Sequence, residues 1–430
     1  MEIHGWGRHP RLQAEVTYPL SASQCAEELG RPGGLIARGL GRGYGDCALA
    51  PRVLDCRYLD HLLAFDESTG LLTCAAGVPL ADILRVFVPR GWFLPVTPGT
   101  QFVSVGGAIA SDVHGKNHHL DGSFCDHLAG LKILLGNGEQ VQASATERPD
   151  LFRATCGGMG LTGVILAASL RLKPIRSSRM IETTIKARDL DAVLAAFAEH
   201  AGRRYSVAWI DCLARGSKLG RSLLMLGEHA DDGPLALSPR RTLAVPFDAP
   251  AGLLNRATMQ TFNALYYSRA QGGTHTRRVG LEPYFYPLDA LADWNRLYGR
   301  AGFVQYQFVV PDARALRAIL ESIATSGRGS FLAVLKVLGR GNDNLLSFPR
   351  EGYTLALDFK AEPAVFQLLD RLDRLVLDHG GRIYLAKDAR MSTATFRAAY
   401  PGWQAFEAVR GRYHAIGKFA SPQSRRLGLQ

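Results

Sequence analysis

Three glycine-rich loops within the first 163 residues restrict what this chain can fold into more than any other feature. The first loop has glycine at every second position, at Gly39, Gly41, Gly43 and Gly45. Without a Cβ atom, these residues can adopt positive φ angles and turn neighbouring backbone N–H groups toward one point. A sharp turn needs fewer glycines, and such nests of N–H groups bind phosphate. The first loop therefore predicts a pyrophosphate site.

The second loop, residues 98–119, combines small side chains with hydrogen-bond donors. Its small residues are Gly106, Gly107, Ala108 and Ala110. Because small residues leave the main chain accessible, a flat ring or a diphosphate can approach it closely. The donors that follow are His114, Lys116 and Asn117. Donors at this point could orient a sugar or stabilise negative charge on a reduced flavin.

Four histidines in or near the second loop raise the question of a metal site. They are His114, His118, His119 and His127. Their spacing matches no metalloprotease pattern, and the sequence has no cysteine pair that would complete a zinc site. We therefore predict that the protein holds no metal, and we expect some of these histidines to be structural.

The third loop contains the pattern G-x-G-x-x-G at Gly158, Gly160 and Gly163. A nicotinamide-binding site of the Rossmann type requires a strand before this pattern and a helix after it. Here residues 149–154 predict a helix, and the apolar run at residues 164–172 predicts a strand. Because this order is reversed, we do not expect a nicotinamide site.

The sequence beyond residue 181 predicts an α+β region with one antiparallel sheet covered by helices. Predicted strands are 205–212, 222–226, 303–310, 331–338 and 353–359, and predicted helices are 189–200, 313–326 and 362–379. Residues 230–280 are irregular, with a basic tip at residues 274–278, and predict a mobile loop region. Residues 381–430 predict a basic helical tail whose buried stripe is Trp403, Phe406 and Val409.

Composition limits the class of protein. A length of 430 residues predicts two or three domains. The net charge of +11 suits an anionic ligand or membrane surface, but the absence of charge runs and of an RNA-binding signature argues against nucleic acid. No apolar run approaches the roughly 18 residues needed to span a bilayer. The seven cysteines include no C-x-x-C pair, which favours a cytoplasmic protein, with docking on the inner membrane as a further expectation.

Several strings along nearly the whole chain carry a resemblance to a known family. They are RGLGRGYGD, PVTPGTQFVSVGGAIASDVHGKNHH, LFRATCGGMGLTGVI, DWNRLYGRAGFVQYQFVVP, GGRIYLAKDAR and FASPQSRRL. In this order they resemble the vanillyl-alcohol-oxidase-type (PCMH-type) FAD-binding family. Within that family, the chain is similar to enzymes that oxidise the 2′-hydroxyl of a polyprenyl-phosphate-linked ribose.

The resemblance implies a two-part FAD-binding domain, residues 1–177 and 382–430, with an inserted substrate-binding domain, residues 178–381. It also implies a hydride transfer from the ribose to FAD, which gives a 2′-keto sugar. A separate short-chain NAD(P)H-dependent reductase would then complete an epimerisation to arabinose. The implied substrate is a lipid-phosphate sugar.

The resemblance also assigns roles to individual residues. Catalytic roles fall to Lys387, His114, Lys116 and Tyr384, and substrate contacts to Gln305, Gln307, Lys336 and Trp209. A lysine beside the flavin is reasonable, because negative charge develops there when a hydride arrives. Cofactor contacts fall to Arg38, Gly39, Leu40, Gly41, Arg42, Gly43, Tyr44, Gly45, Pro98, Gly99, Thr100, Val105, Gly106, Gly107, Ala110, Ser111, His114, Asn117, Gly158, Gly163 and Tyr384.

Departures from the family pattern leave alternatives open. The first loop offers no histidine for covalent attachment, which implies non-covalent FAD. A cysteine of the family's pocket corresponds to Ala356, and an asparagine before it corresponds to Thr354. The alternatives are an FAD-dependent oxidase of a free or nucleotide-linked sugar or related alcohol, and a flavin-fold binding protein without turnover. The base that takes the hydroxyl proton is His114, Lys387 or a water molecule.

Overall fold

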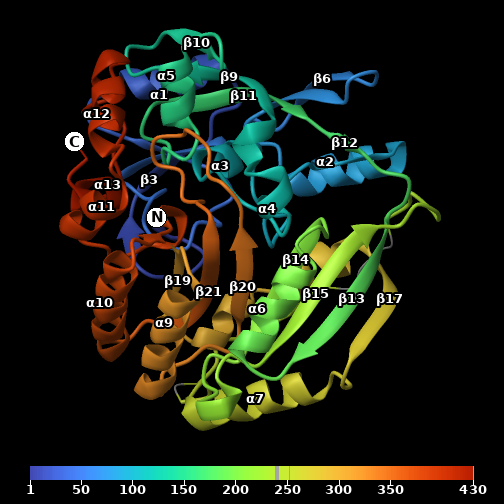
Figure 1. Cartoon of the computed structure of the whole chain (residues 1–430). Helices are drawn as coiled ribbons and strands as arrows, with labels where there is room; N and C mark the ends of the chain where they lie inside the picture. The colour runs from blue at the N-terminus through green and yellow to red at the C-terminus, as the bar shows by residue number, and fades with distance from the viewer. Residues whose placement is uncertain (238–241, 251, 430) are drawn as a thin grey trace.

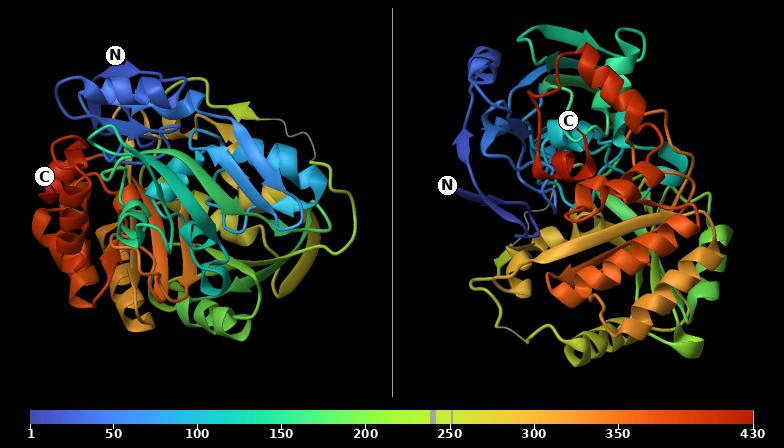
Figure 2. Two further views of the ribbon diagram at one scale, coloured as in Figure 1. Left: turned by 90° about the horizontal axis from the view of Figure 1, so that it is seen from above. Right: turned by 90° about the vertical axis from the view of Figure 1, so that its left-hand side faces the viewer.

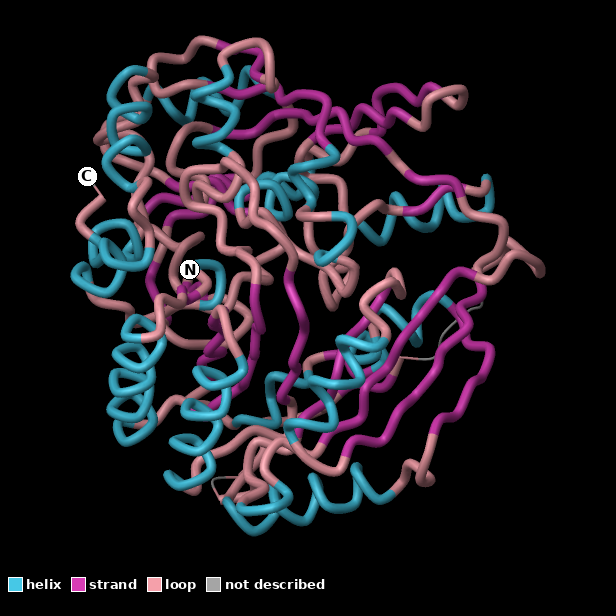
Figure 3. The backbone as a smooth tube through the Cα atoms, in the orientation of Figure 1, coloured by secondary structure: helices cyan, strands magenta, loops and turns pink. Residues whose placement is uncertain are grey.

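The computed structural model describes residues 1–237, 242–250 and 252–429. Figure 1 shows an upper part with short strands and helices above a broad sheet of long strands. The chain enters the broad sheet after β11 (Val164–Arg171) and returns to the upper part at its C-terminal end. The view by secondary structure in Figure 3 shows the same separation.

The upper part is built on two small sheets. A parallel sheet has the order β3 (Glu15–Thr17), β5 (Arg52–Asp55) and β4 (Ile36–Arg38). An antiparallel sheet has the order β10 (Gln140–Ala143), β9 (Leu128–Leu134), β11, β7 (Leu71–Ala75) and β6 (Leu62–Asp66). The helices are α1 (Ala22–Gly30), α2 (Leu80–Phe87), α3 (Val105–Ala110), α4 (His118–Asp121) and α5 (Pro149–Thr155).

Local sequence explains two of these elements. The helix α2 begins directly after Pro79 and is amphipathic, and its apolar stripe is buried in the core. The third glycine loop lies between α5 and β11, so a helix precedes it and a strand follows it. This confirms the order on which the nicotinamide site was rejected.

The broad sheet has eight strands, and every neighbouring pair is antiparallel. Their order is β17 (Thr274–Gly280), β13 (Arg179–Ala187), β15 (Ser222–His229), β14 (Tyr205–Ile210), β20 (Ala333–Leu338), β21 (Gly352–Lys360), β19 (Phe303–Val310) and β22 (Arg382–Ile383). The helices α6 (Leu190–Glu199), α9 (Ala313–Ser326) and α10 (Pro363–Asp378) cover one face. The predicted α+β class with a large antiparallel sheet is confirmed.

The prediction of an irregular loop region at residues 230–280 is wrong for much of its length. Residues 238–241 and 251 lie outside the described part of the chain, but the stretch contains α7 (Arg256–Ser268) and the edge strand β17. Asn255 caps α7 with its side chain. Most side chains of β17 are exposed, so this strand lacks the apolar alternation that usually reveals one.

The C-terminal segment packs against the first loop. After β22 come α11 (Thr393–Ala399), α12 (Trp403–Arg412) and α13 (Pro422–Leu427), beside the N-terminal strands in Figure 2. Within α12, Phe406 and Val409 are buried and Trp403 is partly buried, close to the predicted stripe. The Arg426 guanidinium donates to Asp46 and Asp388 at 2.8 Å each, and so joins the first loop to the loop that carries Lys387.

Candidate active site

The three glycine loops and residues 384–388 meet in one place. The Tyr44 amide donates to the carbonyl of Ala386 at 3.2 Å. A Cβ atom on Gly45 would collide with the Asp388 carbonyl, and one on Gly39 would collide with the Ser104 side chain. Glycine is therefore needed at both positions for close approach rather than for a turn.

The third loop joins the same assembly through the second. The amide of Gly157 donates to Ile109, and the amide of Met159 donates to Ala110, both at 2.9 Å. These carbonyls belong to the last residues of α3, whose first turn contains Gly106 and Gly107. The loops that sequence analysis assigned to the cofactor thus form one continuous cradle.

The first loop has the free donors that a diphosphate requires. Within the described part of the chain, the amides of residues 40–43 donate to no hydrogen-bond acceptor, although these residues are partly exposed. A Cβ atom on Gly99 would meet no atom within 4 Å, so the second loop also borders open space. Free, convergent amides beside open space fit the diphosphate of FAD.

The two arginines of the first loop are held by protein groups. Arg38 donates to the carbonyls of His4 at 2.7 Å and Ala48 at 3.2 Å, so it braces the loop. The Arg42 guanidinium lies over the Trp6 ring, 4.0 Å from its centre. The backbone amides of residues 40–43 are therefore the donors of this loop that stay available to a phosphate.

The face of the broad sheet that α6, α9 and α10 leave uncovered carries the predicted substrate residues. Gln307, Ala356, Val334 and Trp209 stand opposite one another on adjacent strands. The neighbouring pairs are Gln305 with Asp358 and Lys336 with Thr354. Residues directly opposite in antiparallel strands point to the same side, and residues two apart on one strand also share a face. All these side chains therefore share one face, below the cradle.

A lysine and a carboxyl group lie at the end of this face that is next to the cradle. The Lys387 ammonium lies over the Tyr44 ring, 3.8 Å from its centre, in cation–π contact. Burial lowers the pKa of Lys387 to about 7, against the opposing effect of Asp358. Burial likewise raises the pKa of Asp358 to about 7. Each group therefore gains or loses its charge close to pH 7.

His114 is held in one tautomer. Gln307 Nε2 donates to His114 Nε2 at 2.9 Å and to Thr354 Oγ1 at 3.1 Å, and Thr354 donates to the Phe308 carbonyl at 2.8 Å. His114 Nε2 is therefore an acceptor, and Nδ1 carries the hydrogen. Burial and the nearby Lys336 hold the pKa of His114 well below its usual value, so the ring is neutral. Nδ1 has no partner in the described protein and remains available to a ligand.

Tyr384 shapes the wall of the site. Its hydroxyl donates to the Ser111 carbonyl at 2.7 Å, and its ring stacks on Phe348 at 4.6 Å between centres. The ring also lies 5.4 Å from that of His114. Burial holds the pKa of Tyr384 well above its usual value, so the hydroxyl stays protonated.

Lys116 and Asn117 contact residues other than Lys387, Tyr44 and Asp358. The Lys116 ammonium donates to the Tyr284 carbonyl and lies 4.1 Å from the centre of the Tyr284 ring. Burial lowers the pKa of Lys116 to about 7, opposed by Glu182. The Asn117 amide donates to the Pro95 carbonyl and to Asp121. The structure therefore separates these two donors from Lys387.

Lys336 and Trp209 lie farther along the open face. Burial lowers the pKa of Lys336 to about 8. The Trp209 indole N–H donates to the Phe331 carbonyl at 3.1 Å, which fixes the ring. Trp209 is 4% exposed, whereas Val334, opposite it on the next strand, is partly exposed.

Sequence reasoning missed Asp358 and Asp112. Alternation along β21 would have placed Asp358 on the face of Thr354 and Ala356, and a carboxylate in an apolar strand is the signal. Asp112 lies at φ +38° after α3 and gave no local signal. Its carboxylate accepts three hydrogen bonds from the segment before Phe348, from Asn342 at 2.9 Å, Asn344 at 3.1 Å and Ser347 at 2.6 Å.

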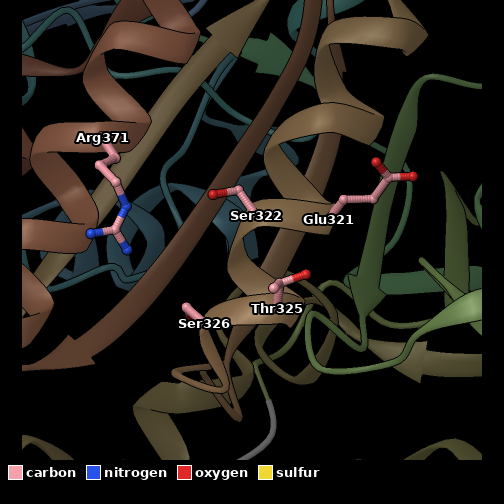
Figure 4. A pocket seen from close by; sticks show the side chains of 5 residues that line it. All are labelled: Glu321, Ser322, Thr325, Ser326 and Arg371. Carbon is pink, nitrogen blue, oxygen red and sulfur yellow. The ribbon is translucent and has the colours of Figure 1, made fainter.

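A hollow in the surface between α9 and α10 lies away from this site. It is lined by Glu321, Ser322, Thr325, Ser326 and Arg371, as Figure 4 shows. These helices cover the opposite face of the sheet, and none of the predicted site residues borders the hollow. The described residues include no group of three or more His, Cys, Asp or Glu side chains placed to hold a metal ion.

Comparison with known proteins agrees with this geometry. Residues 20–144 match the family model described as an FAD binding domain. The chain is 38% identical to decaprenylphosphoryl-β-D-ribose oxidase of Mycolicibacterium smegmatis, over 99% of this chain and 97% of that one. It is 34% identical to an uncharacterised protein of Streptomyces coelicolor, over 82% of this chain and 100% of the other.

A more distant relative matches a smaller part of the chain. D-arabinono-1,4-lactone oxidase of Eremothecium gossypii is 28% identical over 38% of this chain and 31% of its own length. Because similarity to the Mycolicibacterium smegmatis oxidase extends over both chains almost entirely, both the cofactor cradle and the open sheet face fall within it. The chain therefore belongs to the decaprenylphosphoryl-β-D-ribose oxidase family and is an FAD-dependent oxidase that acts on a CH–OH group.

Proposed function

We propose that this enzyme oxidises the 2′-hydroxyl of a ribose linked to a polyprenyl phosphate and produces the 2′-keto sugar. The observation that carries the proposal is the position of Lys387, His114 and Gln307 between the cofactor cradle and the open sheet face. Relatedness to the Mycolicibacterium smegmatis oxidase over almost the full chain supports the choice of sugar.

The chain's own groups would perform complementary tasks. Bound FAD supplies the acceptor for the hydride that leaves the sugar carbon. The Lys387 cation stabilises the negative charge that this transfer creates. His114 offers its Nδ1–H as a hydrogen-bond donor, while Gln307 and Thr354 hold the ring in place. Tyr384 and Phe348 keep water away from one side of the site.

We propose that FAD binds without a covalent bond. The first loop contains no histidine or cysteine from Gly39 to Gly45, and all seven cysteines are buried. The measurement is acid precipitation of the yellow protein. FAD released into the supernatant is the expected result, and a yellow pellet would contradict it.

A row of aromatic rings favours a lipid-linked sugar over a soluble one. Trp209 on the site face lies 4.7 Å from Tyr266 of α7, and Tyr266 stacks on Phe262 at 5.8 Å. Phe262 is 43% exposed, and Leu265 on the same helix is 65% exposed. The row therefore leads from the site face to an apolar surface where a polyprenyl chain can lie.

The same surface suits a membrane. Five large apolar side chains are exposed within the sequence segment 243–265: Leu243, Phe247, Leu253, Phe262 and Leu265. An exposed apolar cluster marks an interaction site, and the net charge of +11 favours an anionic lipid surface. We propose peripheral binding to the inner membrane. No helix in the described residues has both the length and the apolar character that a membrane span needs.

Two further parts of the proposal rest on the family. The family implies a division into an FAD-binding domain, residues 1–177 and 382–430, and a substrate-binding domain, residues 178–381, and we propose it for this chain. The strand β22, at the start of the second FAD-binding segment, pairs with β19 of the broad sheet. A short-chain NAD(P)H-dependent reductase would consume the ketone, because the 2′-keto sugar must be reduced to complete an epimerisation.

The test compares substrates under anaerobic conditions. Polyprenylphosphoryl-ribose should bleach the flavin, whereas ribose 5-phosphate and a nucleotide-linked ribose should not. Leu265→Ser should weaken use of the lipid substrate, and Leu20→Ser is the control, because Leu20 is 64% exposed outside the apolar surface. Equal bleaching by soluble and lipid-linked sugars would replace this proposal with oxidation of a soluble sugar.

A further inference from the structure

The proposed oxidation leaves one proton unassigned. When a hydride leaves the carbon of an alcohol, the hydroxyl proton must go to a base. His114 does not suit this role, because its Nε2 already accepts a hydrogen bond from Gln307 and its Nδ1 carries hydrogen. The Tyr384 hydroxyl donates a hydrogen bond to the Ser111 carbonyl and stays protonated. Neither group is therefore suited to accept the substrate proton.

The three lysines of the region are poor choices for different reasons. Lys116 is turned toward the Tyr284 carbonyl. Lys336 has a pKa of about 8, so it is mostly cationic at neutral pH. Lys387 is needed as a cation to stabilise the charge that develops on the cofactor. A carboxylate base beside Lys387 would leave that cation in place.

Asp358 is the carboxylate that the open face supplies. It is 1% exposed, and the register of β21 places it on the face of Ala356 and Thr354. Its Oδ1 accepts from Gln305 Nε2 at 2.5 Å, while Oδ2 has no partner in the described protein. A buried oxygen without a donor is costly, so an unpaired Oδ2 points to a missing ligand.

The neighbours of Asp358 fix its orientation. Burial raises the pKa of Tyr44, and a side-chain contact with Gln305 opposes that rise. The Gln305 Nε2 group donates to Asp358 Oδ1. The same Tyr44 ring carries the Lys387 ammonium on its face. Tyr44 therefore contacts both Gln305, which donates to Asp358, and Lys387, the proposed cation beside the reduced cofactor.

We propose that Asp358 is the base that accepts the hydroxyl proton of the substrate. The C–H bond breaks with its electron pair, which passes as hydride to bound FAD, and the O–H bond breaks with its proton passing to Asp358 Oδ2. The electrons of the O–H bond form the C=O bond. The sugar loses two electrons and two hydrogens in total, and FAD is the oxidant. Gln305 is a positioning residue in this step.

The assignment rests on the proposed alcohol oxidation, and its pH dependence has a definite sign. A base must be deprotonated, and burial raises the pKa of Asp358 to about 7. The rate constant of flavin reduction should therefore rise with pH as Asp358 loses its proton. Lys387 faces Asp358 and has its own pKa near 7, so it contributes a fall on the alkaline side.

The experiment measures flavin reduction in Asp358→Asn by anaerobic stopped flow, with whichever alcohol reduces the wild-type flavin best. The rate constant should fall by about 10²–10⁴-fold, and the acidic limb of the pH profile should disappear. FAD affinity and the thermal midpoint should remain close to wild type. A rate constant within threefold of wild type, with a pH profile that keeps its acidic limb, would overturn the assignment.

Two further variants separate chemistry from structure. Asp373→Asn removes a carboxylate that is equally buried but on the helix-covered face, where it binds Tyr306, and should leave the rate unchanged. Asp358→Ala should recover part of its lost rate when formate is added, because a small carboxylate can occupy the vacated space. Failure of formate to restore any rate would count against the base. A wild type that reduces only with soluble alcohols would refute the lipid-linked substrate and leave this test intact.

Discussion

The cofactor cradle and the open sheet face reach the same site by different physical means. The cradle depends on backbone contacts that exclude side chains, as at Gly39 and Gly45. The open face depends on side chains that strand register brings together, as with Gln307, Ala356 and Trp209. A change of side chain on the open face should therefore alter chemistry and spare the fold. An added Cβ atom in the cradle should alter cofactor binding.

Among the variants that compare the two regions, Lys387→Met should have the largest effect. It removes the cation and keeps the approximate volume of the side chain. Flavin reduction should slow by about 10²–10³-fold, since a preorganised charge at the developing anion is lost. FAD should remain bound, with an unchanged thermal midpoint. Lys360→Met is the control, because Lys360 pairs with Glu362 at the end of β21. A Lys387→Met rate close to wild type would remove the lysine from the site.

Breaking the contact between the two regions should have the next largest effect. Asp112→Ala removes the acceptor of Asn344 and Ser347 and one of the two acceptors of Asn342. We expect a loss of about 2–4 kcal/mol of stability, measured as a lower unfolding midpoint in urea. Asp343→Ala, in the same segment, is the control, and equal midpoints for the two variants would show that the contact does not matter.

The cradle is tested by Gly45→Ala. The new methyl group collides with the Asp388 carbonyl, which should cost about 1–3 kcal/mol and weaken FAD binding by roughly 5- to 150-fold. The measurement is the dissociation constant from flavin fluorescence. Gly202→Ala adds a methyl group where no atom lies within 4 Å and should bind FAD normally. If Gly45→Ala also binds FAD normally, the cradle does not depend on the absence of side chains, and the contrast with the open face is wrong.

The smallest effect on turnover should come from Ala356→Cys. The substitution adds one sulfur atom on the open face, and turnover should change by less than about threefold, since volume changes this small usually cost little. The new thiol should nevertheless react with a maleimide, while the seven native cysteines are buried and react slowly. If bound substrate slows the labelling of this thiol, position 356 lies in the site. If substrate leaves the labelling rate unchanged, Ala356 lies outside the site.

Local sequence predicted the cradle better than the open face. The glycine spacing at residues 39–45 and the helix-before-strand order around the third loop are local features, so they can be read from one segment. Asp358 acquires its importance only through Gln305, Tyr44 and Lys387, which come from distant segments. The separation of Lys116 from Lys387 likewise depends on where α8 (Leu281–Phe285) places the Tyr284 carbonyl.

Residues 230–280 also show that local sequence cannot predict features that depend on distant segments. Its edge strand β17 pairs with β13 across a long sequence separation, and its exposed side chains gave no strand pattern. The aromatic row from Trp209 to Phe262 also joins separate segments. The resemblance to a family supplied the role of Trp209, while the route toward α7 required the structure.

The central claim is the oxidation of the ribose at C2′, and product analysis tests it most directly. The wild-type enzyme is mixed with polyprenylphosphoryl-ribose under anaerobic conditions, and the product is reduced with borodeuteride. The account predicts loss of the oxidised flavin absorbance together with one deuterium at C2′ of the recovered sugar. Deuterium at another carbon, or a flavin that stays oxidised, would contradict it.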